Sequence, residues 1–162
     1  ALAAGFVRPP ASAEDAPGAA AAAPCGASGL RLAEGLSFED DSSAAFPIVA
    51  DRSGAGELSD RVPTVLFFGA AHCWNTNREA ERVVALYQQH GGDACFLLID
   101  LAHVSEEQRP LVRRFYRGAI PTIAVVDAAG RTVYAEAGET ARRRGDTSTL
   151  EELLRRARAT SP

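Results

Sequence analysis

Phe67-Phe-Gly-Ala-Ala-His-Cys-Trp-Asn-Thr76 is the stretch of sequence that decides the fold. It begins inside an apolar run, residues 64–69, whose length and continuity are typical of a β-strand buried on both faces. A helical pattern follows over about residues 76–89, with apolar side chains on one stripe, charge opposite, and Gly91-Gly92 as the stop. The stretch therefore predicts a strand, a turn that carries Cys73, and a helix.

The next segments continue the alternation of strands and helices. Residues 94–101 form a second apolar run and predict another buried strand. A helix is expected to begin near Ser105, whose side chain can cap it. Residues 122–127 and 132–136, joined by Ala-Ala-Gly130, predict a β-hairpin.

The final element is a helix after Ser148, where Ser148 and Glu151 form a capping box. The resulting order is β-α-β-α-β-β-α. It predicts an α/β fold in which a mixed central sheet is flanked by helices on both sides.

The chain divides into three parts by composition. Residues 1–29 are dominated by Ala, Gly, Pro and Ser and predict an N-terminal tail without a packed core. Residues 30–60 carry only weak signals, among them a short strand near 46–50, and predict an irregular lead-in. Residues 61–162 hold the predicted domain.

A resemblance to a known family rests on two motifs. The stretch 67–76 at the first strand-to-helix turn, and Gly118-Ala-Ile-Pro-Thr122 before the hairpin, together resemble the thioredoxin superfamily over residues 61–162. The resemblance implies a thioredoxin-like fold. It also implies that Cys73 corresponds to the nucleophilic cysteine of the family's Cys-x-x-Cys motif and Thr76 to the second cysteine.

Cys73 is the candidate catalytic residue. A cysteine at a helix N-terminus faces unpaired backbone N–H groups and the positive end of the helix dipole, which favour the reactive thiolate. A protonated His72 would add to this effect. The alternative is that Cys73 is a small buried apolar side chain, because free cysteines are often buried.

Thr76 makes the motif Cys-x-x-Thr, so one thiol is missing. A hydroxyl can donate a hydrogen bond to the Cys73 thiolate but cannot form a disulfide. Phe67 stands where the resemblance implies a buried Asp that assists proton transfer. An ordinary dithiol cycle is therefore not expected, and a mixed disulfide at Cys73 would need an outside thiol for its release.

Pro121 corresponds to the family's cis-proline, and the resemblance implies that it packs against the cysteine. The backbone of Ile120 would then be available to pair with an extended peptide. Trp74 is either a residue that contacts a partner or a ring folded onto its own domain. Asn75-Thr76 departs from the Cys-Gly-Phe-Ser pattern of cluster-binding glutaredoxins, so we expect no cofactor.

The other cysteines do not suggest a metal site. Cys95 lies in a predicted buried strand and is interpreted as part of the core, while Cys25 lies in the predicted tail. No cysteine pair has the close spacing of zinc ligands, and the three histidines add no such pattern. Of the arginine runs, those on helices are expected to be solvated, which leaves residues 142–144 as a modest partner contact.

Composition and charge exclude some classes of function. The formal net charge is −4, with acidic and basic residues mixed, so nucleic acid is not an expected partner. No apolar run approaches the roughly 20 residues of a membrane-spanning helix. A chain that begins Ala-Leu-Ala-Ala is expected to be processed, which favours a bacterial extracytoplasmic space or an organelle such as a plastid.

Two functions remain open from the sequence. The first is an accessory subunit of a larger assembly, which uses the thioredoxin fold as a protein-interaction module and binds through the tail and the Cys73/Pro121 face. The second is a monothiol exchange protein that forms mixed disulfides through Cys73. We expect a protein partner in the first case and a thiol-bearing client in the second.

Overall fold

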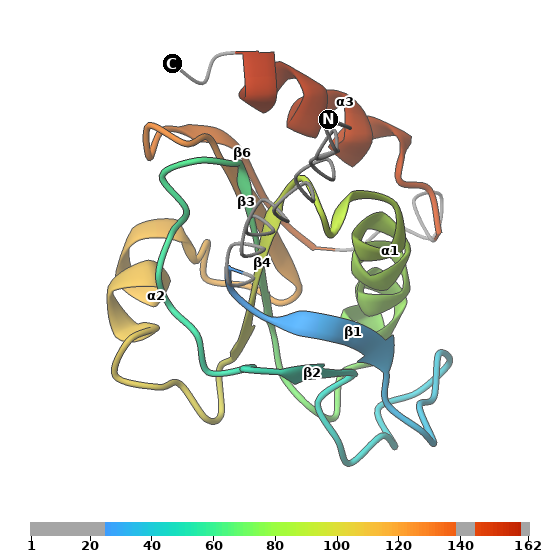
Figure 1. Ribbon diagram of the computed structural model, residues 1–162. Coiled ribbons are helices and arrows are strands. Elements are labelled where there is room, and N and C mark those ends of the chain that lie inside the picture. The colour runs from blue at the N-terminus through green and yellow to red at the C-terminus, as the bar shows by residue number, and fades with distance from the viewer. Residues whose placement is uncertain (1–24, 139–144, 160–162) are drawn as a thin grey trace, which may run out of the picture.

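The computed structural model describes residues 25–138 and 145–159 (Figure 1). Most of the predicted tail therefore lies outside the described residues. The main sheet has the strand order β4-β3-β5-β6. Its strands are β3 (Thr64–Gly69), β4 (Cys95–Asp100), β5 (Thr122–Val126) and β6 (Thr132–Ala137). β3 runs parallel to β4 and antiparallel to β5, so the sheet is mixed as expected.

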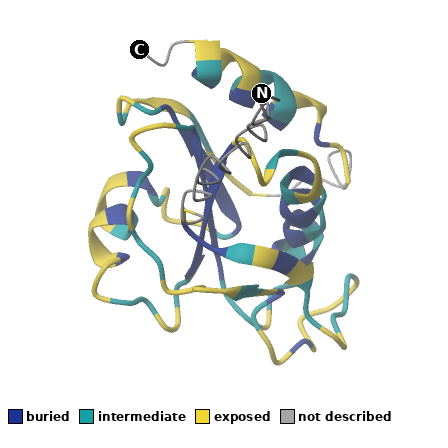
Figure 2. Cartoon of the chain, viewed as in Figure 1, coloured by how far each residue is buried: buried dark blue, intermediate teal, exposed yellow. Residues whose placement is uncertain are grey.

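Helices cover both faces of this sheet (Figure 1). Side chains of β3 alternate between the faces, so Val65 and Phe67 join a core with α1 (Trp74–His90) and α3 (Ser148–Ala159). Leu66 and Phe68 pack on the opposite side, in the core that includes α2 (Arg109–Phe115). Figure 2 shows the buried residues concentrated in the strands and on the inner faces of the helices.

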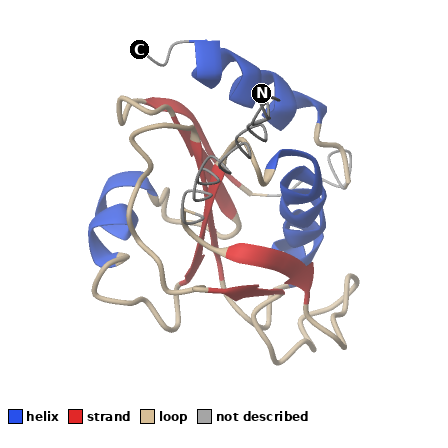
Figure 3. Ribbon diagram, in the orientation of Figure 1, coloured by secondary structure: helices blue, strands red, loops and turns tan. Residues whose placement is uncertain are grey.

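Two further strands lie outside the main sheet. β1 (Ser28–Leu32) and β2 (Ile48–Asp51) pair antiparallel in a small sheet that lies beside α1 (Figure 3). Leu30 and Ile48 are buried in the α1-side core. The segment 30–60, expected to be irregular, is thus attached to the sheet domain through its own strands, and β1 begins inside the predicted tail.

Two helix starts differ from the sequence predictions. α1 begins at Trp74 and not near residue 76, which makes Cys73 its N-cap residue. α2 begins at Arg109 and not near Ser105. The reason for the second difference is Gln108, whose side chain is buried and donates to three backbone carbonyls, one of them that of Leu98. These bonds hold Gln108 in place before the helix. The Ser105 hydroxyl accepts the Gln108 N–H in the turn that precedes α2.

The cap of α3 is also shifted by one residue. Glu151 is a capping partner as expected, but its carboxylate pairs with the Thr147 hydroxyl and not with that of Ser148. The Ser148 backbone N–H donates instead to Asp146 Oδ1 at 2.9 Å. Thr147 and Asp146, which precede Ser148, therefore supply the side-chain contacts at the start of the helix.

α1 carries a buried ion pair in addition to its apolar face. Arg82 Nη2 lies 2.6 Å from Glu79 Oε1, and each side chain is less than 5% exposed, at 3% and 4%. Arg82 Nε has no hydrogen-bond partner among the described residues. No helix in the described ranges is long and apolar enough to cross a membrane.

Candidate functional site

The candidate site lies in the turn between β3 and α1. His72 is exposed and adopts a left-handed backbone conformation (φ 55°), and its N–H donates to the Ser43 carbonyl at 2.9 Å. Cys73 follows with an extended backbone (φ −144°, ψ 103°) and is half-buried. Its carbonyl accepts the first helical bond, from the Asn77 N–H at 3.1 Å. The structure thus places Cys73 at the N-terminus of a 17-residue helix, as the sequence predicted.

Thr76 is fully buried beneath this turn. Its methyl group packs against Gly69, where an added Cβ would lie 2.4 Å from Thr76 Cγ2. Thr76 Oγ1 has no hydrogen-bond partner in the part of the chain that the structure describes. The hydrogen bond that this hydroxyl could donate to the Cys73 thiol is therefore not formed.

Asp41 contacts the start of α1, which the sequence analysis did not foresee. Its Oδ1 accepts a hydrogen bond from the Trp74 N–H at 3.0 Å. That N–H is one of the unpaired donors at the helix N-terminus that were expected to face a Cys73 thiolate. A carboxylate of the same chain thus already uses part of the anion-binding capacity of this helix end.

The loop that carries Asp41 is held on α1 by further bonds. Asn77 Nδ2 donates to the Ser37 carbonyl at 2.6 Å and to Ser43 Oγ at 2.9 Å. Arg78 Nε donates to the Phe38 carbonyl at 2.9 Å. We call residues 37–43 the capping loop. The only sequence signal for it was the run of polar residues Asp40-Asp-Ser-Ser43, which gave no indication of its partner.

Trp74 packs against its own helix. The ring is half-buried, and the guanidinium carbon of Arg78 lies 4.1 Å from the ring centroid, in cation–π geometry. The ring thus contacts its own helix while part of it stays exposed, and the contact of Trp74 with a partner stays a prediction. His72 remains the exposed side chain beside Cys73.

The Ile120–Pro121 peptide bond is cis, as the resemblance implied. Thr122 pairs with Phe68, so Pro121 lies at the end of the sheet from which β3 leads to Cys73. Pro121 is buried, and its carbonyl accepts from the Gly138 N–H at 2.7 Å. Ile120 is half-buried, and its N–H and carbonyl form no hydrogen bond with the described residues.

The position implied for a proton-relay Asp holds an apolar ring. Phe67 is fully buried, and its ring centroid lies 6.0 Å from that of Phe46. Cys95 is fully buried, as predicted, and pairs with Thr64 at the opposite end of β3 from the turn. Cys95 is thus separated from the turn by the length of a six-residue strand, about 17 Å.

The described residues hold no metal-binding cluster. Within residues 25–138 and 145–159, no three His, Cys, Asp or Glu side chains gather where they could hold a metal ion. The arginines at 142–144, named as a modest partner contact, lie outside the described residues.

Comparisons with known proteins concern only the fold. No protein-family model and no curated protein matches the chain. Among solved structures, the germline-specific thioredoxin Deadhead from Drosophila melanogaster is 22% identical, with a TM-score of 0.45, over 60% of this chain and 82% of that one. The thioredoxin of Fasciola hepatica is also 22% identical, with a TM-score of 0.44, over 60% of this chain and 82% of that one. A redox protein from Chlamydomonas reinhardtii is 19% identical with a TM-score of 0.48, over 64% of this chain and 31% of that one.

The topology of the described residues identifies the fold independently. A parallel β3-α1-β4 unit leads through α2 to the antiparallel β5-β6 hairpin and α3. Cys73 stands at the first strand-to-helix turn, and a cis-proline precedes β5. The chain has a thioredoxin-like fold, with Cys73 at its first strand-to-helix turn and Thr76 three residues further on.

Proposed function

We propose that this chain is a protein-interaction module that binds an extended peptide segment of a partner along the backbone of Ile120, next to Cys73. The observation that carries the proposal is the unpaired backbone of Ile120. Its N–H and carbonyl are not used by the described residues, although the neighbouring Pro121 carbonyl is bonded to Gly138. A half-buried backbone with an available donor and acceptor is suited to β-strand addition.

The surroundings of Cys73 support binding over catalysis. Thr76 cannot resolve a disulfide, and its hydroxyl does not reach the thiol. Phe67 supplies no proton relay. Asp41 already accepts the Trp74 N–H and adds a negative charge near the helix start. Each of these features removes one contribution that a reactive thiolate would need.

The module would serve as an accessory subunit of a larger assembly. Residues 1–24 contain few large apolar side chains and suit a segment that orders on a partner. In this proposal the sheet end with Ile120 supplies a peptide-docking edge, and the N-terminal residues supply a second attachment. Two weak contacts on one chain raise the overall affinity through effective concentration.

The test uses selection from a displayed library of random peptides with the full chain as bait. Synthetic versions of the selected peptides should shift the Ile120 amide resonance in NMR spectra. Ile120→Asp should weaken binding by at least tenfold, because it places a charge at the docking edge. Val49→Asp is the matched control, since Val49 is a partly exposed apolar residue (40%) on β2. Equal binding by the Ile120 and Val49 variants would refute the proposed edge.

Monothiol exchange is the second candidate, favoured by the half-exposed position of Cys73 at the start of α1. The Cys73 thiolate would attack a client disulfide and release one client thiolate, and an outside thiol such as glutathione would then free Cys73. Cys73→Ser separates the candidates. It leaves peptide binding unchanged for an interaction module, but it abolishes glutathione-dependent reduction of a small disulfide for an exchange protein.

A further inference from the structure

We propose that Cys25 and Cys95 form an intramolecular disulfide that fastens the N-terminal segment to the free edge of β4. Neither cysteine takes part in the site around Cys73, which lies at the opposite end of β3. The inference is therefore independent of the proposed function.

The backbone brings the two cysteines into register. Gly26 forms a parallel bridge with Phe96, and the Ala27 N–H donates to the Phe96 carbonyl at 2.8 Å. Because the two segments run parallel, the residues that precede this bridge, Cys25 and Cys95, lie opposite each other. Paired strands lie roughly 4.8 Å apart, which is within the Cα separation of about 4.4 to 6.8 Å that a disulfide requires.

Gly26 allows the two segments to approach this closely. A Cβ at this position would lie 2.9 Å from Cys95 Sγ and 2.3 Å from the Phe96 carbonyl oxygen. Its backbone is also left-handed, with φ +67°, a conformation that favours glycine. The segment thus passes directly over the Cys95 sulfur, and the Cys25 thiol is close enough to influence the Cys95 thiol electrostatically.

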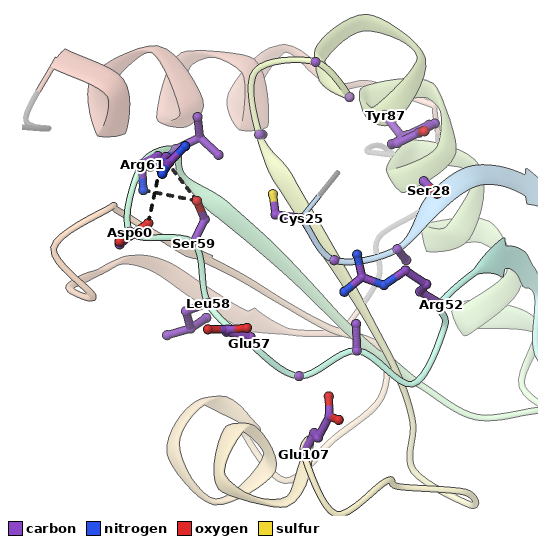
Figure 4. Close-up of a pocket in the computed structure, with 18 residues that line it drawn as sticks. Cys25, Ser28, Arg52, Glu57, Leu58, Ser59, Asp60, Arg61, Tyr87 and Glu107 are labelled. Atoms are coloured by element: carbon purple, nitrogen blue, oxygen red, sulfur yellow. Dashed lines mark hydrogen bonds and ion pairs between the residues drawn. The ribbon is translucent and has the colours of Figure 1, made fainter. Parts of the chain in front are cut away.

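The two thiols differ in access to solvent. Cys25 is exposed and lines a hollow of about 750 Å³ in which Arg52, Glu57 and Arg61 also take part (Figure 4). Cys95 is fully buried, and burial raises the pKa of its thiol well above the ordinary value. A reagent from solvent therefore meets Cys25 first, and Cys95 acts only as the second, internal thiol.

The oxidant in this proposal is a small disulfide of the glutathione class. The Cys25 thiolate attacks one sulfur of oxidised glutathione, forms a mixed disulfide, and releases one glutathione thiolate, which takes up a proton. Cys95 then loses its proton to solvent and attacks the Cys25 sulfur, which expels the second glutathione. Two protein thiols are oxidised to one disulfide, and one glutathione disulfide is reduced to two thiols.

The Cys25–Cys95 disulfide is suited to a lasting structural role and not to rapid catalytic turnover. Reduction begins with an outside thiolate at the exposed Cys25 sulfur and expels Cys95 as the leaving group. A leaving thiol with a raised pKa departs slowly. Once closed, the link encloses residues 25–95 in a covalent loop, which removes conformational freedom from the unfolded chain.

The experiment oxidises the full chain with oxidised glutathione and maps the product by mass spectrometry of peptides under non-reducing conditions. We expect the loss of two hydrogen atoms and a Cys25–Cys95 peptide pair. The matched variants are Cys25→Ser, which changes an exposed side chain and removes the pair, and Cys73→Ser, which leaves it intact. Oxidation should raise the thermal midpoint of the unsubstituted chain and of Cys73→Ser by roughly 10 °C. It should not raise that of Cys25→Ser.

Three results would overturn the proposal. One is a product in which Cys25 remains joined to glutathione and no intramolecular link forms. Another is a Cys25–Cys73 pair in the peptide map. The third is a Cys25–Cys95 link that leaves the thermal midpoint unchanged, because a bond between neighbours already in place should stabilise the fold.

Discussion

Asp41 lies next to Cys73 through the backbone, because it binds the N–H of the following residue, Trp74. It accepts the Trp74 N–H at the point where the dipole of α1 is positive. A thiolate at Cys73 would share this region with a carboxylate of like charge. Asp41 therefore stabilises the start of the helix and occupies a backbone donor that a Cys73 thiolate could otherwise use.

Removal of the Asp41 charge should make Cys73 more reactive. Asp41→Asn keeps an oxygen acceptor for the Trp74 N–H, and we expect alkylation of Cys73 to become about two- to fivefold faster at fixed pH. Asp40→Asn is the control, since the Asp40 carboxylate accepts instead from the Ser42 N–H. The rate is measured by mass spectrometry after timed labelling with iodoacetamide. An equal acceleration in both variants would indicate a general charge effect and not the Trp74 contact.

Thr76 offers a test of whether its hydroxyl serves the cysteine. The hydroxyl is buried and has no partner among the described residues, so Thr76→Val should stabilise the fold by about 1 kcal/mol. The alkylation rate of Cys73 should not change. Thr76→Ser is the matched variant, because it keeps the hydroxyl and removes the methyl that packs at Gly69. If Thr76→Val slows alkylation while Thr76→Ser does not, the hydroxyl assists the thiol after all.

At the scale of single elements, Asp127 organises the turn of the β5-β6 hairpin. Its carboxylate accepts the backbone N–H groups of Ala129 and Arg131 at 3.0 and 2.9 Å, and the Arg131 side chain at 2.8 Å. The backbone bond from Arg131 is the main cause that holds the pKa of Asp127 below the usual value of 3.8. The folded state therefore binds the Asp127 proton less tightly than the unfolded state.

The lowered pKa of Asp127 determines how its contribution to the stability of the fold changes with pH. The stabilisation from Asp127 is fully present above the ordinary carboxyl pKa and is lost as the pH falls through the depressed folded-state pKa. Asp127→Asn should therefore lower the free energy of unfolding at neutral pH, and the difference from the unsubstituted chain should shrink in acid. Urea unfolding of the two proteins at several pH values measures the loss at neutral pH and its decrease in acid. A difference that grows in acid would contradict the assignment.

Breaking the buried ion pair in α1 should lower the free energy of unfolding strongly, whereas replacing both of its residues with apolar ones should lower it little. Glu79→Ala leaves the buried Arg82 guanidinium without its carboxylate, so we expect a loss of roughly 3 to 5 kcal/mol in unfolding free energy. The double variant Glu79→Leu, Arg82→Met should recover most of this loss, since it removes both charges. Chemical unfolding of the single and double variants measures the difference. Equal destabilisation by the two would show that the pair itself, and not an orphaned charge, sets the stability.

At the scale of the whole molecule, two deletions separate the tail from the fold. Removal of residues 1–24 should leave the thermal midpoint nearly unchanged, because their composition offers little to a core. Removal of residues 1–29 should lower it by several degrees. That deletion takes away the buried Ala27 and its bond to Phe96. Differential scanning calorimetry of both variants tests the boundary, and equal midpoints would place Ala27 outside the cooperative unit.

The central fold was predictable because its signals are local. The apolar run at residues 64–69 and the motif around Cys73 specify a buried strand and a helix start without help from distant residues. The cis bond before Pro121 followed from the resemblance and is confirmed. The capping loop could not be foreseen, because the bond from Trp74 to Asp41 joins residues 33 positions apart. No periodicity in either segment encodes that contact.

The bridge between Gly26 and Phe96 has a consequence for synthesis of the chain. The two residues are 70 positions apart, and the N-terminal one leaves the ribosome first. At about 5 to 20 residues per second, β4 follows Gly26 by roughly 4 to 14 s. During that interval the segment before β1 lacks its bridge to the main sheet, and α1 emerges only near the end of it, while Cys25 stands in solvent as a single thiol. Residues 25–27 are thus made well before the strand on which they dock, and the chain around them is open to chaperones until Phe96 emerges.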